Sequence, residues 1–331
     1  MKLNPLLSVS VVLGVSACTE QIPSEPSAGT TPEMRVSKTY TAVALGSLGG
    51  CCSSARGINP AGQVVGESKT AAGLIHAFLW EKGVMIDLGV LGGIVSVANA
   101  INPAGQIVGE TQTPTGSIHA FLWEKGVMTD LGVLGGSFSN ATDINPAGQV
   151  VGYSHTEDAQ THAFLWEKGV MTDLGTLGGS TSLARGINPR GQVVGWSLKA
   201  GNIGVAGFLW ENGIMTDLGT LGGNRTIAFA INPAGQIVGE SETATGSAHA
   251  FLWENGVMTD LGIGSAKSIN PAGQVVVVRG TTAFVWTKGA MADLPHLPGS
   301  NPPNSSRADD INPAGQVVGN SGLEATLWTR K

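Results

Sequence analysis

Charged residues are scarce in this chain, and the scarcity limits the partners it can have. Asp, Glu, Lys and Arg make up 13% of the 331 residues, the formal net charge is −6, and Lys and Arg form no clustered run. Nucleic acids are bound through clustered positive charge that neutralises their phosphates. The sequence therefore argues against a nucleic-acid partner, and its 42% hydrophobic content is too high for a disordered protein.

Motifs that mark catalytic and metal sites are also missing. The chain contains no G-x-S-x-G, H-E-x-x-H or C-x-x-C motif and no EF-hand calcium loop. Its recurring Leu-Gly-Gly segments do not open a helix, so they offer no helix N-terminus to a phosphate. We therefore predict no catalytic residue, no metal site and no cofactor.

Apolar runs long enough to span a bilayer are absent after the N-terminus, but the N-terminus carries a shorter one. Lys2 precedes an apolar stretch over residues 6–15, which has the length of a signal-peptide core. The stretch ends in Val-Ser-Ala-Cys, with the cysteine at Cys18, and this resembles the lipobox of bacterial lipoproteins. The alternative is an ordinary signal peptide that is cut nearby, with Cys18 incidental.

The lipobox resemblance implies that Cys18 is lipidated and is the first mature residue. Several acyl chains on one residue would anchor the protein stably, and Thr19 after the cysteine implies the outer membrane. We expect a signal peptide over residues 1–17, a lipidated and flexible Ser/Thr/Pro-rich tether over 18–39 and a repeat domain over 40–331. The predicted protein is a monomer of the cell envelope or extracellular space that contacts the membrane through its lipid anchor only.

Only two further cysteines are present, and they are adjacent. The Cα atoms of Cys51 and Cys52 must lie about 3.8 Å apart, so a disulfide between them would be strained. Two free thiols and a reducible vicinal disulfide are both compatible with an oxidising compartment.

A repeated unit dominates the rest of the sequence. It has the form A-x-x-I-N-P-A-G-Q-V-V-G-x-S, a variable stretch, then H-A-F-L-W-E-K-G-V-M-T-D-L-G-x-L-G-G, and residues 55–93 hold one complete copy. The tripeptide Ile-Asn-Pro begins at Ile58, Ile101, Ile144, Ile187, Ile231, Ile269 and Ile311. The domain is therefore built from seven copies of one short unit.

Each part of the unit predicts a short strand or a tight turn. The Asn-Pro-Ala-Gly segment at Asn59 has the residues of a type I turn, which would join strands at 55–59 and 63–68. A third strand is expected at 76–81, and a two-residue connection leads into a fourth at 84–89. In two copies this connection is Asn-Gly, a strong hairpin signal. The segments are too short for helices, so each copy is predicted to be a four-stranded antiparallel meander.

The two ends of the chain supply complementary parts of one unit. The last copy stops after its third strand, at residues 325–328, and the missing strand with its Leu-Gly-Gly is found at residues 41–50. These parts complete a unit only if the ends meet, and closure leaves no open sheet edge. We predict an all-β fold, a seven-bladed β-propeller closed by an N-terminal strand, with a β-solenoid or sandwich array as the alternative.

The recurring His-Ala-Phe tripeptide resembles the HAF-repeat family of bacterial extracellular proteins. It begins at His76, His119, His162 and His249, and the longer motif around it covers about residues 41–331. The fourth, sixth and last copies depart from it, for example with Ala-Gly-Phe at Ala206. The resemblance implies an exported β-repeat protein and no established chemistry.

Side chains that recur in most copies are interpreted as framework. His76, Trp80 and Asp87 have counterparts in other copies, and counterparts in separate blades cannot converge on one substrate. We expect the histidines and aspartates to satisfy backbone groups or hold strands together. The tryptophans that end the third strand are expected to form the core between blades.

Residues that break the repeat are better candidates for a binding site. In the predicted propeller, the uniform turns lie on one face and the variable links on the other. The four aromatic residues outside the framework all fall in copies three to five, which places them in one sector. The candidate ligand-binding residues are Phe138, Tyr153, His155, Glu157, Asp158, Arg185, Trp196, Lys199 and Phe229.

Aromatic rings flanked by polar groups suit sugars or peptides. The sequence therefore predicts a non-catalytic binding or adhesion module with a glycan or protein ligand at the cell surface. One alternative is a structural component of the envelope. The other is an enzyme that acts on polysaccharide, with His155, Glu157 or Asp158 as the acid or base.

Overall fold

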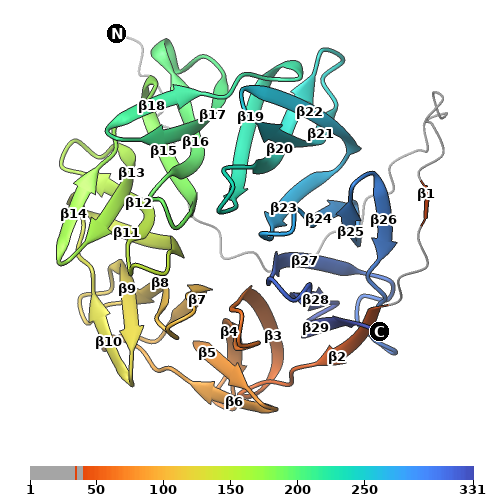
Figure 1. Ribbon diagram of the computed structural model, residues 1–331. Coiled ribbons are helices and arrows are strands. Elements are labelled where there is room, and N and C mark those ends of the chain that lie inside the picture. Colours follow the sequence, from red (N-terminus) through yellow and green to blue (C-terminus); the bar gives the residue numbers. More distant parts are fainter. Residues whose placement is uncertain (1–33, 36–39) are drawn as a thin grey trace, which may run out of the picture. The chain divides into compact units, whose positions relative to one another are not determined.

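The structure is a computed structural model that describes residues 34–35 and 40–331 (Figure 1). The predicted signal peptide, Cys18 and all of the predicted tether except Met34 and Arg35 lie outside the described residues. These two residues form the short strand β1 (Met34–Arg35), which pairs in parallel with Ala290 and Met291. The described part of the chain is almost entirely β-strand, and its one helical element is the 3-10 turn η1 (Ala200–Asn202).

Antiparallel pairing joins consecutive strands in groups of four. The first group consists of β3 (Gly49–Ile58), β4 (Val64–Thr70), β5 (Ile75–Glu81) and β6 (Val84–Asp87), paired in that order. The next five groups repeat this meander, with strands β7 (Ser96–Ile101), β8 (Ile107–Gln112), β9 (Ile118–Glu124), β10 (Val127–Asp130), β11 (Gly135–Ile144), β12 (Val150–Thr156), β13 (Thr161–Glu167), β14 (Val170–Asp173), β15 (Gly178–Ile187), β16 (Val193–Lys199), β17 (Val205–Glu211), β18 (Ile214–Asp217), β19 (Gly222–Ile231), β20 (Ile237–Thr243), β21 (Ala248–Glu254), β22 (Val257–Ile263), β23 (Ser265–Ile269), β24 (Val275–Arg279), β25 (Thr282–Thr287) and β26 (Ala290–Asp293).

The last group takes strands from both ends of the chain. It contains β27 (Ser306–Ile311), β28 (Val317–Ser321), β29 (Glu324–Arg330) and, next to β29, β2 (Tyr40–Ala44). The predicted pairing of the N-terminal strand with the last copy is therefore confirmed. In Figure 1 the groups follow one another around a central axis, which is the arrangement of a β-propeller, so each group is a blade.

A closed ring of asparagines joins the blades at the turn between their first two strands. The side-chain Nδ2 of Asn59 donates to the carbonyl oxygen of Asn102 at 3.2 Å, and Asn312, in the last blade, donates to the carbonyl of Asn59 at 3.2 Å. The seven donors, each bonded to the next, are Asn59, Asn102, Asn145, Asn188, Asn232, Asn270 and Asn312. The Oδ1 atom of Asn59 also accepts from the backbone of Ala61 and Gln63, which fixes the predicted turn.

A β-bulge in the first strand of each blade explains one repeated glycine. In the pairing of β3 with β4, Ala55 lies opposite Gly66 and Gly57 lies opposite Val65, so Arg56 has no partner. The bulge brings the Ser54 carbonyl so close that a Cβ atom on Gly66 would overlap its oxygen. The close approach at the bulge favours glycine in the second strand, and the blade of β23 and β24 is the exception, with Val277 opposite Ala266.

The innermost strand of the first blade, β3, is longer than predicted. It begins at Gly49 rather than near residue 55, because Gly49 already pairs with Thr70. A Cβ atom on Gly50 would lie 2.6 Å from the Cβ of Lys69, so the Gly-Gly pair allows the first two strands to approach closely.

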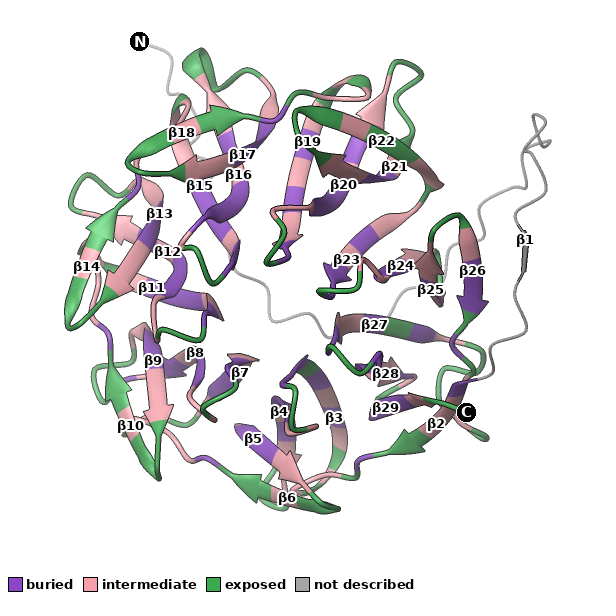
Figure 2. Cartoon of the chain, in the orientation of Figure 1, coloured by how far each residue is buried: buried purple, intermediate pink, exposed green. Residues whose placement is uncertain are grey.

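The cores lie between neighbouring blades, and five of the seven clusters contain a fully buried phenylalanine. Phe121 is fully buried and packs with Val65 and Ala98, which come from two blades. Trp123 is only partly buried at the edge of the same cluster. The prediction of tryptophan cores is confirmed for Trp328, which is fully buried, whereas the other six tryptophans are partly buried and pack against the clusters between blades. Figure 2 shows the inner strands mostly buried or intermediate and most of the outermost strands exposed, whereas β26 is partly buried.

Candidate functional site

The innermost strands enclose a cavity on the axis of the propeller. Its volume is about 490 Å³, and it continues into a second cavity of about 220 Å³ that shares many of its lining residues. Each blade contributes the residue that lies two positions before the isoleucine of Ile-Asn-Pro. These residues are Arg56, Asn99, Thr142, Arg185, Phe229, Lys267 and Asp309.

The β-bulge turns these seven side chains toward the axis. In every blade the pairing skips this residue, as it skips Thr142 between Ala141 and Asp143 and skips Lys267 between Ala266 and Ser268. The alanine before it is fully buried in each blade. Because a bulged residue has no partner across the ladder, it can be re-aimed out of the sheet. We call the seven bulged residues the channel ring.

Two of the arginines at the cavity are neutralised by carboxylates. Arg56 donates through a terminal nitrogen to Oε1 of Glu67 at 3.0 Å, and Arg307 donates through Nε to Oδ1 of Asp309 at 2.9 Å. Glu110 accepts a hydrogen bond from the Asn140 amide. Burial raises the pKa of both Glu110 and Asp309 above the usual value, with these partners opposing the rise.

Two other cations at the cavity form no ion pair with any described residue. Arg185 has no hydrogen bond to another part of the described chain, and its Nε is buried without a partner. Lys267 places its ammonium over the ring of Phe229, 4.2 Å from the ring centre, in a cation–π contact. Burial lowers the pKa of both Arg185 and Lys267.

An aromatic cluster adjoins the cavity. The ring centroid of Phe138 lies 5.8 Å from that of Tyr153 and 5.1 Å from that of His155. Tyr153 lines the cavity, and burial raises the pKa of its hydroxyl. Strand β12 therefore carries one aromatic ring at the cavity and a histidine just beyond it.

The structure separates the residues predicted to form one ligand site. Tyr153, Arg185 and Phe229 line the axial cavity, and Phe138 and His155 adjoin it through Tyr153. The other four predicted residues, none of which lines either axial cavity, are Glu157, Asp158, Trp196 and Lys199.

These four residues lie in three different environments. Glu157 and Asp158 are exposed in the turn that follows β12. Trp196 is half-buried and lies opposite Leu183 in the ladder. Lys199 forms an ion pair with Asp217 of an outermost strand at 2.7 Å. Of the three residues considered as acid or base, His155 packs against Phe138, and Glu157 and Asp158 are exposed to solvent.

Five members of the channel ring were not predicted as site residues: Arg56, Asn99, Thr142, Lys267 and Asp309. The site was expected in the variable links between blades and strands, whereas the ring lies within the most regular part of the unit. The signal was present in A-x-x-I-N-P, because the first variable position after the invariant alanine is the bulged residue.

Deeper in the channel, two aspartates tie neighbouring innermost strands together. Asp143 accepts from the backbone N–H of Ile187 in the next blade at 2.9 Å, and Asp310 accepts from that of Ile58 at 3.0 Å. Burial raises the pKa of Asp143 to about 7 and also raises that of Asp310. These bonds assign both carboxylates to the frame of the propeller.

The recurring histidines and aspartates hold the two outer strands of a blade together. Nδ1 of His76 lies 2.8 Å from Oδ2 of Asp87, and the other carboxylate oxygen accepts from the Gly89 amide. The same His–Asp contact occurs in three further blades. The prediction that these residues hold strands together is confirmed.

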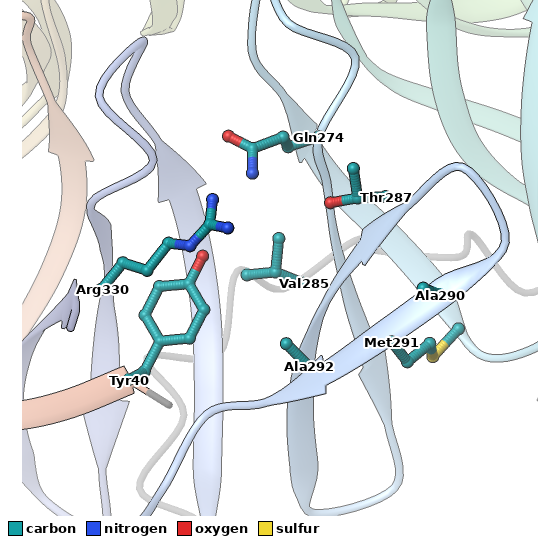
Figure 3. Close-up of a pocket in the computed structure, with 8 residues that line it drawn as sticks. All are labelled: Tyr40, Gln274, Val285, Thr287, Ala290, Met291, Ala292 and Arg330. Atoms are coloured by element: carbon teal, nitrogen blue, oxygen red, sulfur yellow. The ribbon is translucent and has the colours of Figure 1, made fainter. Parts of the chain in front are cut away.

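A smaller pocket lies beside β2 and the C-terminal strand, lined in part by Tyr40 and Arg330 (Figure 3). Its volume is about 70 Å³, which is far below that of sites for sugars or drug-sized ligands, roughly 300–1,000 Å³. Cys51 and Cys52 are free thiols with their sulfur atoms 2.7 Å apart. In the described part of the chain, no three His, Cys, Asp or Glu residues are grouped as metal ligands, and no helix is long and apolar enough to cross a membrane.

No family model and no curated protein sequence matches this chain, but solved structures do. YCF48 bound to the D1 peptide is similar over 90% of this chain and 99% of that one, at 13% identity and a TM-score of 0.56. A puromycin-hydrolyzing peptidase of Mycobacterium tuberculosis matches over 81% and 49% of the two chains, at 12% identity and a TM-score of 0.56.

TolB from Acinetobacter baumannii matches 85% of this chain at 11% identity and a TM-score of 0.50, and this chain spans 64% of its length. This chain spans about half of the length of the peptidase, 49%. These neighbours are β-propellers. Because the identities are so low, these similarities establish the fold of this chain and nothing more. That fold is an all-β propeller.

Proposed function

We propose that this protein is a seven-bladed, exported β-propeller of the HAF-repeat type that binds a ligand without catalysis in its axial channel. The observation that carries the proposal is the channel ring. Seven copies of one frame present seven bulged residues of six types to one cavity of about 490 Å³. A cavity of this volume, lined by a few polar and aromatic groups, is suited to a small ligand or the end of a larger one.

The blade count and the location of the ligand are supported by different features. The asparagine ring runs through all seven copies of Ile-Asn-Pro and returns to its start. The cavity combines the Phe229 and Tyr153 rings with amide, hydroxyl and cationic groups, which suits a glycan or peptide. YCF48 was solved with a peptide, and we propose the same general role, ligand binding by a propeller, for this chain.

The test is to narrow the channel and compare binding with a matched change elsewhere. The full chain is screened against arrays of envelope glycans and peptides, and its ligands are then titrated with Thr142→Trp and Thr172→Trp. Thr142 lines the cavity, whereas Thr172 is exposed on the outermost strand β14.

Thr142→Trp should abolish binding while Thr172→Trp leaves it unchanged, with both variants folded by circular dichroism. A ligand that binds a folded Thr142→Trp protein with unchanged affinity would exclude the channel as the site.

Export as a lipoprotein is tested at Cys18, which lies outside the described residues. Because the lipobox resemblance implies lipidation of this cysteine, Cys18→Ala should move the protein from the membrane fraction to the soluble fraction. Fractionation that finds the variant still in the membrane rules out the lipid anchor.

A further inference from the structure

Positive charge is in excess at the axial cavity although the chain as a whole is negative. Four cationic side chains and two carboxylates line the larger cavity, whereas the chain has a formal net charge of −6. Asp309 is engaged by Arg307, and Arg56 is engaged by Glu67. The cations of this cavity that have no carboxylate partner are Arg185 and Lys267, whereas the Glu110 carboxylate is held by the Asn140 amide.

Carboxylates near Lys267 do not neutralise it. Glu240 and Asp309 both act electrostatically on Lys267, but Glu240 forms an ion pair with Arg225 at 2.7 Å and Asp309 is held by Arg307. Arg185 and Lys267 also repel each other, since the charge of Arg185 lowers the pKa of Lys267. A desolvated cation without a partner destabilises a folded protein.

Hydrogen-bond donors face the same space. Arg185 offers guanidinium donors and Lys267 offers an ammonium, and neither has an acceptor among the described residues. The Tyr153 hydroxyl lines the cavity with them and has no hydrogen bond to the described chain. A group of donors without acceptors is complementary to a ligand that is rich in acceptors and carries negative charge.

We propose that Arg185 and Lys267 together bind the oxyanion, a carboxylate or a phosphate, of a sugar-sized ligand in the channel. This inference rests on the proposed function and adds the chemical class of its ligand. The planar guanidinium of Arg185 matches two oxyanion oxygens, and the ammonium of Lys267, positioned by the Phe229 ring, supplies a second charge. The ligand oxyanion replaces the missing counter-ion, so binding removes the repulsion between the two cations.

The experiment measures binding to the full chain by titration calorimetry. The probes are glucuronate, glucose 6-phosphate and neutral glucose, which share a sugar ring and differ in the charged group. At least one anionic sugar should bind more tightly than glucose, and its affinity should fall as the salt concentration rises. Glucuronate alone identifies a carboxylate as the ligand group, and glucose 6-phosphate alone identifies a phosphate.

Three variants locate the charge that is responsible. Arg185→Gln and Lys267→Gln should each weaken binding of the anionic sugar by about tenfold to a hundredfold, the range expected for a lost charge-assisted hydrogen bond. Arg190→Gln is the matched control, because it removes the same charge from the same blade, but Arg190 is exposed in the turn after Asn188 and lines neither cavity. Its affinity should equal that of the unchanged protein.

The inference is overturned if neither anionic sugar binds more tightly than glucose, or if their affinity survives both Arg185→Gln and Lys267→Gln. Failure of this inference differs from failure of the proposed function. A neutral array ligand that is lost in Thr142→Trp and retained in Arg185→Gln would keep the channel as the binding site and discard the oxyanion. Thermal melts of each variant, with and without the anionic sugar, separate lost binding from lost folding.

Discussion

The channel ring lies on the innermost strands and the asparagine ring lies three residues later, in the turns that follow them, yet the two rings differ in how far their residues vary. At Asn59 and its six counterparts the residue never changes, and at Arg56 and its counterparts it changes in almost every blade. Each asparagine contacts only repeated atoms, its own turn and the carbonyl of the next asparagine. Each channel-ring residue faces the axial cavity.

The difference separates stability from recognition in one strand. A residue that bonds to the repeated frame has the same partners in every blade, so one residue type satisfies all of them. A residue that faces the cavity is not restricted in this way, and the seven copies together can form an asymmetric surface on a symmetric frame. Changes to the asparagine ring should therefore reduce stability, and changes to the channel ring should reduce binding.

Opening the closed ring of blades should lower the thermal stability of the protein more than any other change. Deleting residues 41–50 removes most of β2 and the start of β3, and it leaves β29 as an unpaired edge. We expect a much lower and less cooperative melting transition, together with aggregation, measured by scanning calorimetry and light scattering. Deleting residues 19–33 of the predicted tether is the control and should leave the melt unchanged. Equal melts for the two deletions would contradict ring closure.

Replacing one residue of the asparagine ring should lower the free energy of unfolding more than replacing the channel-ring residue three positions before it. Asn145→Ala removes the bond to the Asn188 carbonyl and leaves the amides of Ala147 and Gln149 without their acceptor. Unsatisfied buried groups cost about 1–3 kcal/mol each, so we expect a loss of about 3–6 kcal/mol in the free energy of unfolding.

Thr142→Ala, three residues earlier on the same strand, removes one hydroxyl bonded to two carbonyl oxygens and should cost about 1 kcal/mol. Urea unfolding measures both values. Similar losses for Asn145→Ala and Thr142→Ala would remove the distinction between the two rings.

The frame carboxylate of Asp143 should make stability depend on pH. Burial raises its pKa from 3.8 to about 7, so between these values the folded state holds more protons than the unfolded state. The contribution of Asp143 is therefore complete below pH 3.8 and is lost as the pH rises through 7, up to about 4 kcal/mol in all.

Urea unfolding of the unchanged protein and of Asp143→Asn at pH 4.5 and 7.5 tests this. The variant should gain stability relative to the unchanged protein at the higher pH. A stability difference that is equal at the two pH values would show that Asp143 has the same pKa when folded and unfolded.

The smallest expected effect concerns two arginines of the channel ring. Arg56 is paired with Glu67, so Arg56→Gln leaves that carboxylate without its partner; because the pair is partly exposed, this should lower stability by about 0.5–1 kcal/mol. Arg185 has no such partner, so Arg185→Gln should change stability by less than about 0.5 kcal/mol or raise it slightly. Chemical unfolding at low salt measures both. A larger loss for Arg185→Gln than for Arg56→Gln would place Arg185 in the frame.

Much of this arrangement could be predicted from the sequence because its signals are local. The Asn-Pro-Ala-Gly turns, the short segments between them and the incomplete copies at the two ends predicted antiparallel strands and their closure. The binding residues were harder to predict, because alternation along a strand assigns side chains to faces only while the register is regular. The bulge at Arg56 breaks that register in each copy, and nothing in a single copy shows that its bulged residue will meet six others.

The repeated unit, its strands and its turns follow from the sequence, because turn chemistry and strand periodicity act over a few residues. The identity of the variable residues that share a cavity depends on the tertiary structure. Arg185 and Lys267 are far apart in the chain, and they come together because each blade places its bulged residue on the same axis. The tertiary structure also places Phe121 within a core and Trp123 at the edge of that core, because burial there depends on the neighbouring blade.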